Sequence, residues 1–134
     1  MKKSILLVLA SCCSLFLMLT SCEYEKLMEP ADPDLCDTLM VTYESEMKAV
    51  IDRSCAYTGC HDGMGGIGPF DYTTYEGLTN VFDDIEARVI ELRDDPALGM
   101  PPDNSVYEQS RKDNLTQREL DLFRCWIDAG FPRN

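Results

Sequence analysis

Cys55 and Cys60, with His61 directly after them, form the group of residues in this chain best suited to chemistry. His61 is the only histidine among the 134 residues. Thiols and an imidazole this close together can form a disulfide, bind a metal ion, act as a nucleophile or attach a cofactor. Each use makes different demands on the rest of the sequence, so the other residues decide between them.

Two of these uses fit the sequence poorly. A structural zinc site needs four ligands, usually in paired clusters, whereas Cys36 and Cys125 are far from the group in sequence. A cysteine–histidine nucleophile needs side chains that face each other, but the adjacent side chains of Cys60 and His61 diverge on a helix or a strand. A plain disulfide between Cys55 and Cys60, with an incidental histidine, remains open.

The start of the chain has the pattern of an exported bacterial lipoprotein. Lys2 and Lys3 precede an apolar run over residues 5–19, which is typical of an export signal. The run leads into Leu-Thr-Ser-Cys, which resembles a lipobox, so we predict a signal peptide over residues 1–21 and a lipid on Cys22. An uncut membrane anchor is the alternative, but the apolar run is short for a spanning helix.

The domain that follows is predicted to be single, exported and acidic. Cys12 and Cys13 leave with the signal and Cys22 is lipidated, so four of the seven cysteines remain, an even number in an oxidising compartment. Residues 22–35 are interpreted as a lipidated tether and residues 36–134 as the domain. The formal charge of −12 becomes −14 without Lys2 and Lys3, which argues against nucleic acid and anionic lipid as partners.

The segment from Cys55 to His61 resembles a widened form of the haem-attachment motif of cytochromes c. In that family two thiols add to the haem vinyl groups, and the histidine binds the iron from one face. The resemblance implies one covalent haem c, attached through Cys55 and Cys60, with His61 as the proximal iron ligand. The chain departs from the usual motif because four residues, rather than two, separate the cysteines.

Met100 is the candidate for the second axial ligand. It stands before Pro101 and Pro102, which exclude a helix and predict a stiff loop. The loop resembles the Met-Pro loop of small cytochromes c, and this implies that the Met100 sulfur binds the distal face of the iron. A methionine that only fills a packing gap is the alternative. With no second histidine, ligation by two histidines from within the chain is excluded.

Helices are expected around this group. Apolar residues at helical spacing predict one helix over residues 42–53 and another over residues 80–92. A capping box of Thr116 and Glu119 opens a last helix, which Gly130 closes. Its pattern, from Leu-Thr-x-x-Glu-Leu to Trp-Ile-x-x-Gly, resembles the C-terminal helix of small bacterial cytochromes c. We therefore predict an all-α, class I-like cytochrome c domain.

The resemblance also bears on the remaining cysteines. Terminal helices cross in cytochromes c, so Cys36, before the first helix, and Cys125, within the last, are expected to meet as a disulfide. Two unpaired buried thiols are the alternative.

These interpretations predict an electron carrier and not an enzyme; a methionine on the distal face argues against a peroxidase. We expect a monomer that exchanges electrons with redox proteins and is anchored through Cys22 to the outer membrane, on its periplasmic or outer side, in preference to the inner membrane. The alternative is a haem-free surface lipoprotein that acts as a binding module, in which Cys55 pairs with Cys60.

Overall fold

The computed structural model describes residues 33–134. The predicted signal peptide, Cys22 and all but the last three residues of the predicted tether lie outside the described residues. Residues 33–134 are helical and form no strand, and a single isolated bridge pairs Asp62 with Asp71. The predicted all-α class is therefore confirmed for this part of the chain. None of its helices has the length and apolar character needed to span a membrane.

Two of the predicted helices each consist of an α-helical and a π-helical segment. The segment predicted over residues 42–53 is a π-helical turn followed by an α-helix, and the segment predicted over residues 80–92 has the two in the opposite order. The elements are α2 (Pro33–Leu39), η2 (Tyr43–Met47), α3 (Lys48–Ser54), α4 (Tyr75–Thr79), α5 (Phe82–Ile85), η3 (Glu86–Glu91) and α6 (Gln117–Asp128), where η marks the π-helical segments.

Side-chain caps fix where two of these helices begin. The Thr116 hydroxyl accepts a hydrogen bond from the Glu119 backbone N–H, and the Glu119 carboxylate accepts one from Thr116 in return, as predicted for α6. Thr42 and Ser45 form the same reciprocal arrangement at the start of η2. Helix α2 begins at Pro33, so the end of the predicted tether is helical.

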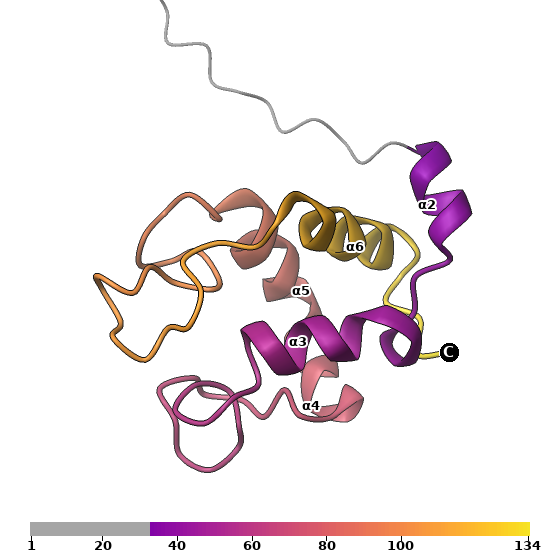
Figure 1. Cartoon of the computed structure of the whole chain (residues 1–134). Coiled ribbons are helices and arrows are strands. Elements are labelled where there is room, and N and C mark those ends of the chain that lie inside the picture. Colours follow the sequence, from indigo (N-terminus) through magenta and orange to yellow (C-terminus); the bar gives the residue numbers. More distant parts are fainter. Residues whose placement is uncertain (1–32) are drawn as a thin grey trace, which may run out of the picture.

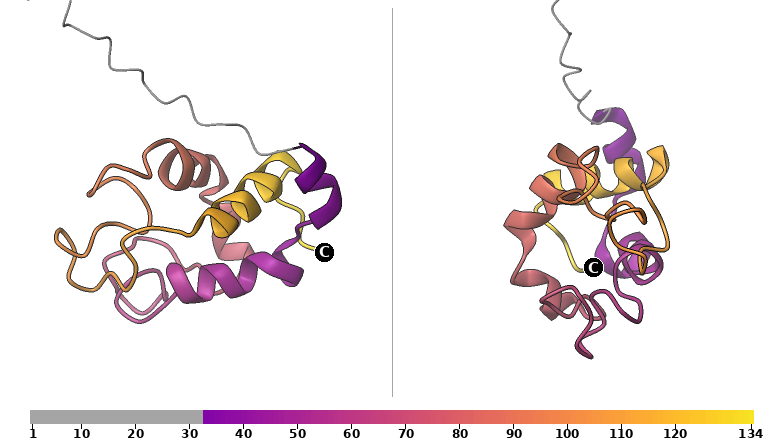
Figure 2. Two further views of the ribbon diagram at one scale, coloured as in Figure 1. Left: turned by 45° about the horizontal axis from the view of Figure 1, so that its top comes forward. Right: turned by 90° about the vertical axis from the view of Figure 1, so that its left-hand side faces the viewer.

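The helices and the long loops occupy different ends of the molecule. In Figures 1 and 2, α6 and α3 run past each other, while α2 and the C-terminus lie at one end. Residues 55–74 and 92–116, which contain no helix, form the loops at the other end. We call these two segments the loop region, and the rest of residues 33–134 the helical region.

An aromatic cluster fills the centre of the helical region. Trp126 is 0% exposed, and its indole N–H donates to the Pro132 carbonyl at 2.9 Å. The rings of Phe82 and Phe131 stack with centroids 4.2 Å apart, and both meet Trp126 edge-on. The Trp126 ring packs against aromatic rings from η2, α5 and the C-terminal segment, and its N–H is hydrogen-bonded. The indole therefore holds these three parts of the chain against α6.

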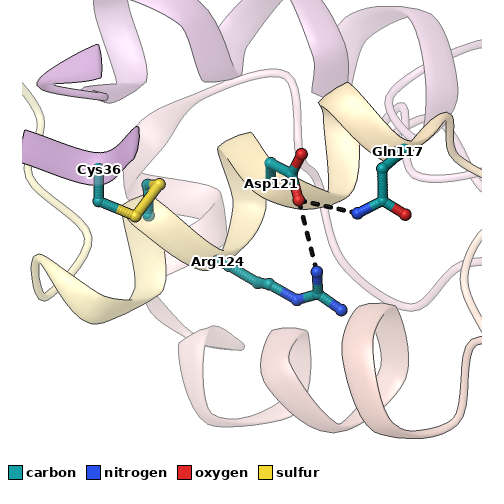
Figure 3. The surroundings of a disulfide bond; sticks show 5 residues. Cys36, Gln117, Asp121 and Arg124 are labelled. Carbon is teal, nitrogen blue, oxygen red and sulfur yellow. Dashed lines mark hydrogen bonds and ion pairs between the residues drawn. A yellow bond between two sulfur atoms is a disulfide. The ribbon is translucent and has the colours of Figure 1, made fainter. Parts of the chain in front are cut away.

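A disulfide joins α2 to α6. The sulfur atoms of Cys36 and Cys125 are 2.05 Å apart, and the bond closes a sequence separation of 89 residues. Figure 3 shows the disulfide beside three side chains of α6. Among these, the Asp121 carboxylate accepts hydrogen bonds from the Gln117 amide and from the Arg124 guanidinium. The pairing expected from crossed terminal helices is therefore present in the structure.

Candidate functional site

Cys55 lies at the C-terminal end of α3, at the boundary between the helical and loop regions. Cys55 follows the last residue of the helix, and its N–H donates to the Ile51 carbonyl at 2.8 Å. The thiol is free and packs against the apolar core. Burial, reinforced by the neighbouring Cys60 thiol, raises the pKa of Cys55 to about 12, so this thiol stays protonated at neutral pH.

The residues between the two cysteines form a compact turn that is fastened to the second loop segment. The Cys60 N–H donates to the Tyr57 carbonyl at 2.9 Å, and Gly59 adopts a φ of +94° that favours glycine. The Tyr57 ring is buried, and its hydroxyl accepts a hydrogen bond of 2.9 Å from the Arg111 N–H. Burial and a hydrogen bond with the Cys60 side chain raise the pKa of Tyr57. The second free thiol is thus held beside a buried phenol.

His61 is buried, with only 8% of its surface exposed. Its ring stacks on Tyr72, with centroids 3.9 Å apart and planes 7° apart. The imidazole also approaches Gly68 so closely that a Cβ there would lie 2.2 Å from Nδ1. Burial lowers the pKa of His61, partly offset by the Phe70 carbonyl, and the imidazole is therefore neutral at pH 7. Within residues 33–134, Nδ1 has no hydrogen-bond partner.

Met100 lies in the second loop segment, where the chain folds back on the end of η3. Its N–H donates to the Arg88 carbonyl at 2.9 Å, and its side chain is partly buried against the core. The peptide bond between Met100 and Pro101 is cis. The thioether is therefore carried by a loop that is attached to a helix rather than by a free segment.

Two adjoining cavities lie where the loop segments meet α5 and η3. One of about 200 Å³ is lined by both Cys60 and Met100, which are 40 positions apart in sequence. The other, of about 130 Å³, is lined by Met100 and by Tyr72, the residue on which His61 stacks. Pro69 and Arg88 also line both cavities. Cys55 and His61 lie behind these walls and line neither cavity.

A larger cleft of about 430 Å³ lies at the other end of the molecule, beside the disulfide. Its walls come from α2, the end of α6 and the C-terminal segment, and they include Met40, Val41 and Pro132. It contains neither a free thiol nor the imidazole. Of the residues singled out in the sequence, Met100 lines both smaller cavities and Cys60 lines one of them.

A buried carboxylate ties the end of α3 and the second loop segment to α6. Glu119 accepts hydrogen bonds from the Arg53 guanidinium at 2.7 Å, from the Lys112 ammonium, and from Thr116. Arg53 lies two residues before Cys55, and Lys112 lies in the loop segment that carries Tyr57's partner Arg111. Burial raises the pKa of Glu119, but the hydrogen bonds outweigh it and hold the pKa at about 2.

Sequence patterns did not indicate several of these contacts. Tyr72 and Gly68 enclose the imidazole, yet nothing in their local sequence distinguishes them from ordinary loop residues. Tyr57 offered a weak signal, because a large aromatic residue between two cysteines needs a place to pack. Glu119 was predicted as a helix cap, and its ion pairs with Arg53 and Lys112 appear only in three dimensions.

The part of the chain that the structure describes has no cluster of side chains ready to bind a bare metal ion. Within residues 33–134, no three His, Cys, Asp or Glu side chains are grouped so that they could hold a metal. The two free thiols, the buried imidazole and the thioether are donors of the types found in c-type haem sites, but of these four residues only Cys60 and Met100 line a common cavity. The sequence matches no family model, and it has no significant match among curated proteins or solved structures.

Proposed function

We propose that this protein is a c-type electron carrier that holds one haem in its loop region. One observation carries the proposal: Cys60 and Met100, from loop segments far apart in sequence, line the same cavity, and the buried His61 directly follows Cys60. In this proposal Cys55 and Cys60 form the two thioether bonds. His61 and Met100 are the axial ligands of the iron.

The surroundings of each residue suit that role. A neutral imidazole has a lone pair available for iron, and the stacked Tyr72 would keep its ring in one orientation. The protonated thiol of Cys55 is in the form that adds to a vinyl group. When bound, the haem supplies a one-electron iron couple, and His/Met ligation raises its reduction potential. The protein side chains then bind, orient and shield that couple without taking part in substrate chemistry.

Attachment of the haem would require the loop region to open. Pockets that hold organic ligands have volumes of roughly 300–1,000 Å³, and each of the two cavities is smaller than this. The exposed side chains of Ile67 and Leu98 stand on opposite loop segments at the larger of the two. We expect these segments to separate when the haem is attached, while the helical region stays as it is.

The setting of the carrier is part of the same proposal. Lipidation at Cys22 would anchor the domain to the outer membrane, and a monomer would exchange electrons with redox proteins there. Its net charge of −12 favours solubility and electropositive partners over nucleic acid.

The proposal is tested by producing the full chain in cells with an active cytochrome c maturation system and staining a denaturing gel for haem. We expect a stained band for the wild-type chain and none for the Cys55→Ser/Cys60→Ser double variant. Met100→Ala should keep the covalent haem but change its absorbance, because the sulfur ligand is lost. Met64→Ala is the matched control, since Met64 is an exposed loop methionine, and it should change neither.

A haem-free wild-type chain, in cells where a known cytochrome c is loaded, would overturn the proposal. A disulfide between Cys55 and Cys60 in that material would then favour the binding module instead.

A further inference from the structure

We propose that Arg88 is a positioning residue that holds the Met100 loop in place through its backbone carbonyl and its guanidinium together. This inference rests on the proposed ligation of a haem iron by Met100. Arg88 lies in η3, whereas the loop that it contacts follows the end of that element.

The backbone contact arises from how η3 ends. The Leu92 N–H closes the element by donating to the Ala87 carbonyl at 2.9 Å. Carbonyls in the last turn of a helix lack partners within the helix and have to find them elsewhere. The Arg88 carbonyl accepts the Met100 N–H at 2.9 Å, so the proposed ligand is bonded directly to the end of the element.

The side chain of Arg88 contacts the same loop on the other side of Gly99. Its guanidinium donates to the Leu98 carbonyl at 3.2 Å. Gly99 lies so close to the end of η3 that a Cβ there would be 2.6 Å from the Leu92 carbonyl oxygen. Residues on both sides of Gly99 are thus bonded to Arg88, and the glycine between them allows the close approach.

The position of Arg88 relative to the cavities connects these bonds to the proposed iron ligand. Arg88 and Met100 line both cavities, and Arg88 is the only cationic residue among the residues that line them. The side chain of Arg88 is half-buried, whereas its bond to the Leu98 carbonyl is exposed to solvent. Loss of the guanidinium would remove one of the two bonds that fasten the Met100 loop to Arg88 and allow the loop to move away more easily.

Arg93 offers a matched control. It lies at the same end of η3, but its guanidinium faces Asp94 at 3.5 Å and it lines neither cavity. Truncating its side chain removes a charge of the same sign from the same neighbourhood without removing a bond to the Met100 loop.

The test uses haem-loaded wild-type protein and the variants Arg88→Ala, Arg88→Lys and Arg93→Ala. Ferric protein is titrated with imidazole, which competes with the Met100 sulfur for the iron. We expect Arg88→Ala to bind imidazole about threefold more tightly, because an exposed hydrogen bond between the guanidinium and the Leu98 carbonyl no longer opposes loop opening. The imidazole affinity of Arg88→Lys, which keeps the aliphatic part of the side chain and the charge, should lie between those of the wild type and Arg88→Ala. The affinity of Arg93→Ala should equal that of the wild type.

Hydrogen exchange at the Met100 amide provides a readout that does not depend on ligand competition. It should become faster in Arg88→Ala and stay unchanged in Arg93→Ala. Unchanged imidazole affinity together with unchanged exchange in Arg88→Ala would overturn the inference.

The two proposals can fail separately. If Met100→Ala leaves the spectrum unchanged, ligation by Met100 is wrong and the positioning role falls with it. If Met100→Ala alters the spectrum but Arg88→Ala alters neither readout, only the role of Arg88 is wrong. If Arg88→Ala does not fold, Arg88→Lys gives the same comparison.

Discussion

The helical region and the loop region differ in how their cysteines and aromatic rings are used. Around Trp126 the rings interlock, the indole N–H is bonded, and the Cys36–Cys125 disulfide closes the region. In the loop region two cavities separate the segments, two thiols are free and the Nδ1 atom of His61 has no partner within residues 33–134. Native interiors are usually close-packed and satisfied. The contrast teaches that cysteines and rings close the helical region, whereas the loop region keeps its thiols free. Packing in the helical region is not complete either, because the larger cleft and the buried hydroxyls of Tyr43 and Ser54, unpaired within residues 33–134, belong to it.

The largest difference between the two regions should appear when their cysteines are removed. Cys36→Ala with Cys125→Ala should lower the free energy of unfolding by about 4 to 5 kcal/mol, because the bridge closes a long loop in the unfolded chain. Cys55→Ser with Cys60→Ser, compared in haem-free protein, should cost less than about 2 kcal/mol. Urea denaturation followed by circular dichroism measures both. Equal losses would show that stability is not concentrated in the helical region.

The Glu119 cluster, which joins the two regions, should give the next largest effect. Glu119→Gln removes a buried charge and leaves Arg53 and Lys112 without their partner, so we expect a loss on the order of 3 kcal/mol at pH 7. Asp52→Asn is the control, because its ion pair with Lys48 is exposed and should contribute no more than about 0.5 kcal/mol.

The same carboxylate predicts the sign of a pH dependence. Its pKa is about 2 in the folded chain, below the ordinary value of 4.5, so its contribution is present above pH 4.5 and is lost as the pH falls toward 2. Chemical denaturation at several pH values should therefore show the gap between wild type and Glu119→Gln closing across this range. A gap that stays constant down to pH 2 would contradict the assignment.

A smaller effect is expected where the loop segments are fastened to each other. Tyr57→Phe removes the acceptor of the Arg111 N–H and should lower the free energy of unfolding by about 1 kcal/mol. Hydrogen exchange should become faster at the Arg111 amide and stay unchanged in α6, since the bond lies within the loop region. Faster exchange throughout α6 would mean that the two regions unfold as one unit.

The sequence was informative where local patterns control the structure. Apolar periodicity located the helices before Cys55 and before Met100, and the Thr116–Glu119 capping box located the start of α6. The π-helical character of η2 and η3 was not predicted, because π turns have no distinct apolar period. Helix α2 was not predicted, since its first residues were assigned to the tether and no helix was expected before residue 42.

The candidate site was predictable in its residue types but not in its surroundings. Cys55, Cys60, His61 and Met100 were identified from motif and order, and the structure brings Cys60 and Met100 to one cavity. The stacking of Tyr72 on His61 and the ion pair of Arg53 with Glu119, 66 positions away, depend on how the chain folds back on itself. Contacts of this kind leave no periodic signal in a single sequence.

The central claim is that Cys55 and Cys60 carry a haem, and peptide mass spectrometry tests it most directly. Wild-type protein from cells with working cytochrome c maturation is digested without reduction, and the peptide that contains both cysteines is identified. We predict that this peptide carries the mass of one haem, while the Cys36 and Cys125 peptides remain joined by their disulfide. A haem-free peptide in which Cys55 and Cys60 are linked to each other would contradict the account.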